Sequence, residues 1–132
     1  MIPLTQAMGV RMVNYTEGEL VLEAPLALNH NHLGTAFGGS LNTLATLACY
    51  GLVWLELEDP GCHVVIRESS IAFLRPVTGD FRATCRRPDD AAMKEFKERF
   101  AHKDRARLRL AATIEQAGIV CVQFEGTFVA AR

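Results

Sequence analysis

The sequence lacks several features that would assign it to other classes of protein. Its 132 residues carry 14 basic and 15 acidic side chains, a formal net charge of -1, so the basic surface of a nucleic-acid binder is missing. No repeats, linkers or low-complexity tracts interrupt it, and its length predicts one domain over residues 1–132. The first ten residues, MIPLTQAMGV, lack the basic and apolar regions of a signal peptide, so we expect none.

The cysteines are few and widely spaced, without any C-x-x-C pair. They lie in apolar or strand-like segments, which predicts reduced core thiols and a cytoplasmic protein. The four are Cys49, Cys62, Cys85 and Cys121.

No charged residue occurs from Leu41 to Leu55, within a chain that is 49% hydrophobic. One asparagine and two threonines interrupt it, and no basic cluster flanks it, so a buried helix is favoured over a membrane span. The predicted helix covers residues 37–57. The sequence EDPG that follows ends it, because proline cannot continue a helix and glycine permits a turn.

Alternating apolar and polar residues predict strands on both sides of this helix. Two short strands flank the turn at Glu17–Gly18, and four more follow the helix, with a short amphipathic helix at residues 88–103 among them. An antiparallel sheet of this kind must bury one face, and the apolar helix can cover it. The prediction is an α+β fold, with five to six antiparallel strands curved round one long helix and a small extra helix.

Five segments carry a resemblance to a known family: NHLGTAFGGSL, GLVWLELE, VVIRESSIAFLRPV, DFRATCR and FEGTFVA. They resemble the thioesterase domain that some bacterial proteins carry behind an acetyltransferase domain, within the hotdog-fold thioesterase superfamily. The run T-A-F-G-G-S and the strand ending in L-R-P-V are its more specific parts. The resemblance implies a curved antiparallel sheet wrapped round a central helix. It also implies hydrolysis or binding of acyl thioesters on coenzyme A or acyl carrier protein, without a cofactor.

By the same resemblance, the protein is a homodimer with sites at the subunit interface, and a tetramer is the alternative. Neither a nucleic acid nor a membrane is an expected partner.

The loop before the helix holds most of the expected catalytic residues. Backbone N–H groups of Gly38 and Gly39 would begin the helix without internal partners and stabilise a developing oxyanion. The alternative is that these glycines only permit tight packing. A nucleotide P-loop is excluded, because no G-K-[ST] follows. The resemblance assigns Asn31 to orienting the thioester or the water, with Asn29 as a substitute. The alternative for Asn31 is an asparagine that caps a turn.

The better-known relatives follow a pattern that is incomplete here. It resembles N-x-x-G-x-x-H-G-G, with a carboxylate two to three turns into the helix. Phe37 stands at the position of the histidine, and Thr46 at the position of the carboxylate. A threonine hydroxyl can hold a water but cannot take its proton unaided at neutral pH. The mechanism of those relatives therefore does not transfer intact.

Glu68 is the first candidate for the missing base. We expect it on an apolar strand face, where a carboxylate is costly unless it is functional or paired. A buried salt bridge is the alternative. His30 and His32 are the second candidates, as bases supplied by the partner subunit's loop or simply as exposed loop residues. Two imidazoles without a third ligand do not predict a metal site.

The expected substrate-binding residues are Phe37, Ser40, Tyr50 and Arg107. Tyr50, with Trp54, would close an acyl tunnel, although their spacing also fits ordinary helix packing. Arg107 belongs to a stripe of arginines that would hold the nucleotide of coenzyme A or an acidic carrier protein. A solvated strand face is the alternative for this stripe, which comprises Arg82, Arg86, Arg105, Arg107 and Arg109.

Three functions follow from these residues. The first is an acyl-thioester hydrolase, and the second is a domain that binds acyl thioesters without turnover. The third, a dehydratase, is the weakest, because such enzymes of this fold need a histidine and a carboxylate. No residue in the sequence predicts the length of the acyl chain.

Overall fold

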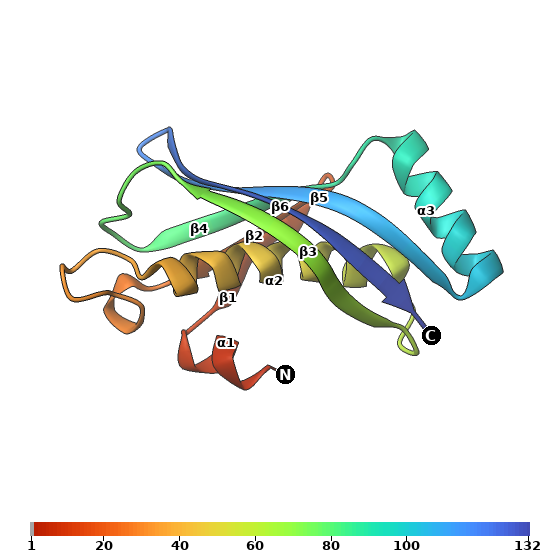
Figure 1. Cartoon of the computed structure of the whole chain (residues 1–132), viewed down its shortest axis with the longest axis horizontal. Coiled ribbons are helices and arrows are strands. Elements are labelled where there is room, and N and C mark those ends of the chain that lie inside the picture. Colours follow the sequence, from red (N-terminus) through yellow and green to blue (C-terminus); the bar gives the residue numbers. More distant parts are fainter. Residues whose placement is uncertain (1) are drawn as a thin grey trace.

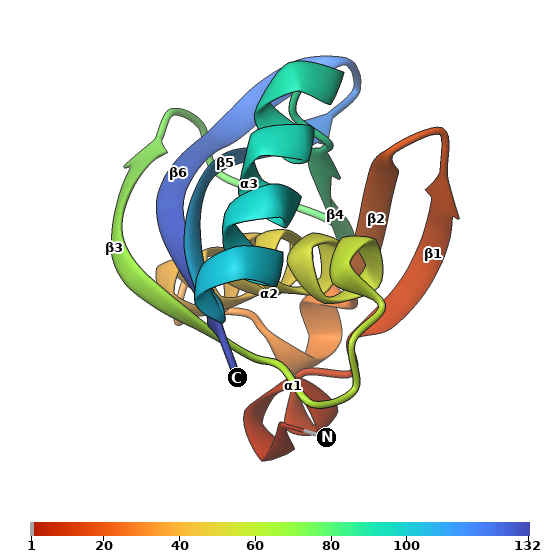
Figure 2. The same cartoon turned by 90° about the vertical axis from the view of Figure 1, so that its right-hand side faces the viewer.

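The computed structural model describes residues 2–132. Its six strands form one antiparallel sheet in the order β1-β2-β4-β5-β6-β3. The sheet arches over the long helix α2 (Figures 1 and 2). This arrangement confirms the predicted α+β hotdog fold. The elements are α1 (Pro3–Ala7), β1 (Arg11–Thr16), β2 (Glu19–Ala24), the 3₁₀ helix η1 (Leu26–Leu28), α2 (Gly38–Leu57), β3 (His63–Phe73), β4 (Phe81–Arg86), α3 (Asp90–Lys103), β5 (Arg105–Gln116) and β6 (Ile119–Ala131).

Helix α2 fills the concave face of the sheet. Each fully buried leucine side chain contributes about 1.5–3 kcal/mol of hydrophobic stabilisation. At Gly51 the sheet comes so near that an added Cβ would lie 2.8 Å from Leu20 Cδ2. Glycine therefore lets α2 pack directly on β2. The buried residues of α2 are Leu41, Leu44, Ala45, Ala48, Cys49, Leu52 and Val53.

The limits of α2 agree with the prediction to within one residue. Phe37 is the N-cap residue, and the helix ends at Leu57, with Glu58 in the left-handed region at φ 51°. The predicted inward faces of β4 and β5 are also buried. Across residues 2–132, no helix is long and apolar enough to cross a membrane.

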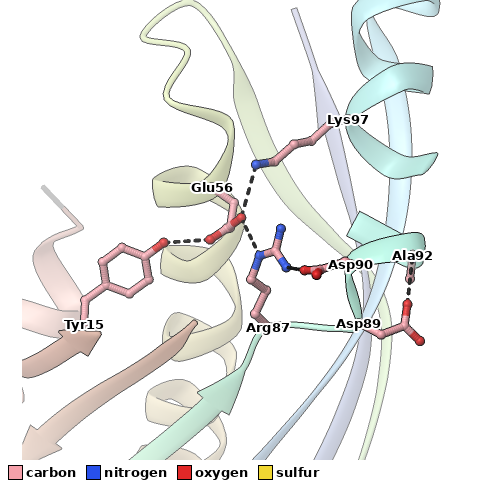
Figure 3. A network of polar contacts seen from close by, with 7 residues as sticks. All are labelled: Tyr15, Glu56, Arg87, Asp89, Asp90, Ala92 and Lys97. Atoms are coloured by element: carbon pink, nitrogen blue, oxygen red, sulfur yellow. Dashed lines mark hydrogen bonds and ion pairs between the residues drawn. The ribbon is translucent and has the colours of Figure 1, made fainter. Parts of the chain in front are cut away.

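A polar network holds the C-terminal end of α2 (Figure 3). The carboxylate of Glu56 accepts hydrogen bonds from Tyr15 at 2.8 Å and Arg87 at 2.9 Å, and pairs with Lys97 at 3.2 Å. Arg87 also pairs with Asp90. Burial alone would raise the pKa of Glu56, but its three donors outweigh burial and hold that pKa below its usual value. Burial and the bond to Glu56 raise the pKa of Tyr15 to about 12.

The small helix α3 extends the same core beyond the end of α2. Asp89 caps it by accepting a hydrogen bond from the Ala92 N–H at 2.8 Å. Its apolar stripe is buried, and Glu95 pairs with Arg99 at 3.2 Å, as its spacing predicts. The buried stripe consists of Met93, Phe96 and Phe100.

Helix α1 lies across the open side of the arch (Figure 2). The sequence pattern did not predict it, because a five-residue helix carries too little periodicity. Thr5 and Met8 are buried there. Asn29, also buried, donates from Nδ2 to the carbonyls of Met8 at 2.9 Å and Pro25 at 2.7 Å. This amide ties α1 to the loop that precedes α2.

Candidate active site

Helix α2 begins without a cap. Phe37 at the N-cap position offers no side-chain oxygen, and no acidic residue follows in the first turn. Within the part of the chain that the structure describes, the N–H groups of Gly38, Gly39 and Ser40 meet no acceptor. Unpartnered N–H groups and the dipole of a 20-residue helix concentrate positive potential at this point. Such a helix start favours a developing oxyanion.

Two phenylalanine rings flank the helix start. The ring of Phe37 lies over Gly39, where an added Cβ would come within 2.5 Å of Cε2. The ring of Phe73, from the end of β3, lies beside Gly38, where an added Cβ would stand 3.5 Å from Cζ. Both rings are more than half exposed, at 57% and 53%. Apolar rings beside unpaired N–H groups suit a ligand with one polar oxygen on an apolar chain.

A hollow of about 330 Å³ opens beside Gly38. Among residues 2–132, Arg75 is the one charged side chain in its lining, and it makes no ion pair with any of them. Arg75 was not among the expected site residues, although it lies in the L-R-P-V run. The lining residues are Thr35, Ala36, Gly38, Leu41, Phe73, Leu74, Arg75, Pro76 and Val77.

Asn31 caps the turn of its own loop, which was the alternative to a catalytic role for this residue. Its Oδ1 accepts hydrogen bonds from the N–H groups of Leu33 at 2.8 Å and Thr35 at 3.1 Å. Its Nδ2 donates to Thr35 Oγ1 at 2.8 Å. The side chain therefore shapes its own loop, and a catalytic role for it stays a prediction. Asn29 is buried, and its Oδ1 meets no donor among residues 2–132.

Thr46 lies seven residues beyond Gly39, which places both on one face of α2. Its hydroxyl donates to Asn42 Oδ1 across 3.5 Å, a long contact. The Asn42 amide nitrogen has no acceptor in the described chain. The two side chains together can hold a water molecule. Asn42 was missed, although its spacing of four residues from Thr46 on a helix was a usable signal.

The prediction that Glu68 lies on the apolar face of β3 is wrong. A β-bulge shifts the register of β3 against β6 between Ile66 and Glu68. One extra residue reverses the alternation of side chains beyond it. Ile66 pairs with Phe128, which is buried, whereas Glu68 pairs with Thr127 on the outer face. Glu68 is exposed there and makes no ion pair among the described residues.

The two histidines of the loop are exposed. His30 forms an isolated β-bridge with Ala36, and its Nδ1 lies 3.0 Å from the Asn31 carbonyl. In the described chain, no group of three His, Cys, Asp or Glu side chains gathers as a metal site. The loop is thus closed on itself by backbone pairing, with its imidazoles facing solvent.

The arginine stripe lies on the outer face of the sheet, away from α2. Strand β4 pairs with β5 through residues 83–85 and 112–114, and Arg86 of β4 lines one hollow with Arg109 of β5. Three of them pair with glutamates: Arg82 with Glu23, Arg86 with Glu19 and Arg109 with Glu125. Arg105 and Arg107 make no ion pair within residues 2–132.

A second, apolar hollow of about 230 Å³ lies between α1, α2 and β3. Tyr50 and Thr46 line it, whereas Trp54 does not. Ser40 is half-buried at the helix start, outside this hollow. The structure therefore groups the predicted residues into two neighbouring sets. Gly38, Gly39, Phe37 and Ser40 surround the start of α2, and Thr46 and Tyr50 lie further along the helix.

A curved antiparallel sheet round one helix, with that helix left uncapped at its start, defines a hotdog-type thioesterase fold. A family model described as "Putative thioesterase (yiiD_Cterm)" matches residues 1–132, and the chain belongs to this family.

Solved structures agree with this assignment. A protein of unknown function from Chlorobaculum tepidum is 34% identical, with a TM-score of 0.93 over 99% of this chain and 87% of that one. A protein from Shewanella oneidensis, named a putative thioesterase, is 30% identical, with a TM-score of 0.85 over 100% of this chain and 90% of that one. A Pseudomonas aeruginosa protein named a probable thioesterase is 26% identical, with a TM-score of 0.84 over 98% of this chain and 87% of that one.

Proposed function

We propose that the protein hydrolyses acyl thioesters carried on coenzyme A or acyl carrier protein. The observation that carries this proposal is the uncapped start of α2, where Gly38 and Gly39 present unpartnered N–H groups. The thioester oxygen would accept from these groups, and its growing negative charge would be stabilised more in the transition state than in the substrate. Loss of one such donor in other enzymes typically lowers kcat by about 10²–10³.

Water is the proposed nucleophile. It attacks the carbonyl carbon, the carbon–sulfur bond breaks, and the products are a carboxylic acid and the free thiol, which takes up a proton. The Asn42–Thr46 pair, linked at 3.5 Å, is the proposed water-holding group, because it offers both a donor and acceptors. No cofactor is needed for this reaction.

The proton acceptor is proposed to come from a second subunit. None of the side chains lining the two hollows is a carboxylate or an imidazole, within residues 2–132. His30 and His32 lie on an exposed loop and are the remaining candidates. The bulge at Arg67 gives no support to Glu68 in this role, because it turns that carboxylate to the outer face.

A homodimer fits the exposed edge of the sheet. Strand β3 is an edge strand of 11 residues. Several of its large apolar side chains are exposed, and a long apolar edge invites pairing with another strand. A second copy pairing there would extend both sheets with two-fold symmetry. The exposed side chains are Val65, Ile66 and Phe73, with Leu74 just beyond the strand.

The cytoplasm is the proposed location. All four cysteines are buried and unpaired, as suits a reducing compartment.

Binding without turnover is the second candidate function. The observation that favours it is the absence of a carboxylate or imidazole from the side chains lining both hollows, among the described residues. Release of free thiol by the purified protein, over acyl-coenzyme A esters and an acyl carrier protein thioester, separates the two. Turnover on any of them supports the hydrolase. Tight binding with no thiol release across the whole panel would leave the binding function.

A further inference from the structure

The apolar hollow between α1, α2 and β3 has the lining of a pocket for an alkyl chain. Among residues 2–132, its only polar side-chain atoms are the hydroxyls of threonines and of Tyr50, and no charged residue lines it. At about 230 Å³ it is smaller than the sites of roughly 300–1,000 Å³ that hold drug-sized molecules. The lining residues are Ile2, Thr5, Thr43, Thr46, Leu47, Tyr50, Val64, Val65, Ile66 and Phe128.

This pocket lies on the same face of α2 as Gly39. Gly39, Thr43, Thr46 and Tyr50 are spaced by three or four residues and therefore share one face of the helix. At about 1.5 Å per residue, Thr43 lies about 6 Å and Tyr50 about 17 Å beyond Gly39 along the axis. A thioester whose oxygen meets the N–H groups at the helix start can thus extend its acyl chain along this face into the pocket.

Helix α1 borders the far part of this path. Ile2 and Thr5 of this segment line the pocket together with Leu47 and Tyr50. The same four residues also line a neighbouring hollow of about 620 Å³. Thr5 is buried and donates from Oγ1 to the Ile2 carbonyl at 2.8 Å. Asn29 holds the end of α1 through the Met8 carbonyl. The floor of the pocket is therefore tied to the loop that leads into the site.

The length of the path limits the chain. An extended chain of single bonds advances about 1.2 Å per bond, judged from the roughly 3.5 Å that three backbone bonds span. A path of about 17 Å has the length of about 14 such bonds. The Tyr50 ring and α1 occupy the space that the last few of these bonds would need. Long-chain groups would collide with the Tyr50 ring and with Thr5 of α1.

We infer that this pocket binds the acyl chain of the substrate and that α1 and Tyr50 set its length, at about eight to twelve carbons. The inference rests on the proposed function, since it takes the thioester oxygen to lie at the helix start. It narrows the proposed substrates from acyl thioesters in general to those of medium chain length. The side of the pocket beside β3 is open in one chain, and a second copy paired at β3 would cover it.

Binding of S-alkyl-coenzyme A thioethers, from butyl to hexadecyl, tests this without hydrolysis. By calorimetry we expect affinity to rise about three- to fourfold per methylene until the chain reaches Tyr50, and then to level off or fall. The Leu47→Phe variant, which fills the pocket, should move the optimum to shorter chains by two carbons or more. The Tyr50→Ala variant should move it to longer chains. Trp54→Ala, one turn further and outside the pocket, is the matched control and should leave the optimum unchanged.

Two results would overturn the inference. One is an affinity that does not depend on chain length. The other is an optimum that stays in place in both pocket variants while their thermal unfolding matches the native protein. If Leu47→Phe abolished self-association and left the chain-length profile unchanged, the pocket would instead belong to a second copy of the chain. A shifted optimum with no thiol release from the matching thioesters would uphold the pocket and contradict only the hydrolase.

Discussion

The ring of Phe37 lies over Gly39 so closely that a Cβ at residue 39 would stand 2.5 Å from Cε2 of that ring. The neighbouring glycine, Gly38, has more space around it. A Cβ on Gly38 would stand 3.5 Å from Cζ of Phe73, an ordinary contact. Neither glycine has a positive φ, so the closeness of the Phe37 ring, and not backbone strain, singles out residue 39.

The Gly39→Ala variant should therefore lose activity while remaining folded. The Phe37 ring is 57% exposed and can move aside, and alanine favours a helix over glycine by about 1 kcal/mol. We expect the free energy of unfolding to change by no more than about 1 kcal/mol. We expect kcat/KM to fall by about tenfold or more, because the methyl group and displaced ring crowd the proposed oxyanion site. Gly38→Ala is the matched control with a smaller effect, and equal losses in both variants would contradict this account.

Much of the fold could be predicted from the sequence because its strands alternate cleanly. Phe81, Ala83 and Cys85 face the core as their spacing requires. The face of Glu68 could not be predicted, since one bulged residue at Arg67 reverses the pattern beyond it. Periodicity carries no signal for a bulge within an edge strand.

The loop before α2 was predictable in outline and not in detail. The glycines of the helix start could be recognised from their sequence and from the family resemblance. The role of the Asn31 side chain depends on which turn the loop adopts, and its bonds to Leu33 and Thr35 are set by backbone geometry. The place of α1 depends on tertiary contacts such as Asn29 to the Met8 carbonyl, which no local pattern encodes.

The base is expected from the loop of the second subunit and not from Glu68. Glu68→Gln should leave kcat/KM within about twofold of the native value, because the carboxylate lies on the outer face of the sheet. Loss of a true general base would instead lower the rate by about 10²–10⁴-fold. One of the two variants His30→Gln and His32→Gln should remove the base, and that variant should lower kcat by about 10²-fold or more.

Mixed dimers test where that histidine acts. If one subunit supplies the helix start and the other the histidine, mixing the inactive histidine variant with Gly39→Ala should restore up to about a quarter of native activity, by random pairing of subunits. No recovery on mixing, with subunit exchange verified, would contradict a shared site. A large loss in Glu68→Gln with the fold intact would return the role of base to that carboxylate.

The exposed edge of β3 should be the self-association surface. Val65 is 59% exposed on this strand, so Val65→Lys should leave the fold intact and place a charge in the paired edge. Sedimentation should then show monomers where the native protein gives dimers. Ile119→Lys, at an exposed residue of similar character (48%) at the start of β6, is the control. Dissociation by both variants, or by neither, would argue against pairing through β3.

The free energy of unfolding should fall in acid as the Glu56 carboxylate becomes protonated. Its pKa lies below the usual value in the folded protein, so its contribution is present above the unfolded pKa of about 4.3 and is lost as pH falls below that value. Urea unfolding between pH 7 and pH 3 should show this loss. Glu56→Gln should lower the free energy of unfolding at pH 7 by about 1–3 kcal/mol and flatten the pH dependence. Glu95→Gln, in an exposed pair with Arg99, should change little by comparison.

The rate of thiol release from acyl-coenzyme A esters of two to sixteen carbons tests hydrolysis at the start of α2 most directly. The native protein and the Gly38→Ala and Gly39→Ala variants should be measured side by side. We expect turnover by the native protein to be greatest for medium chains. Gly39→Ala should largely abolish this turnover, and Gly38→Ala should largely retain it. No thiol release from any ester, while alkyl thioethers still bind, would contradict hydrolysis at the start of α2.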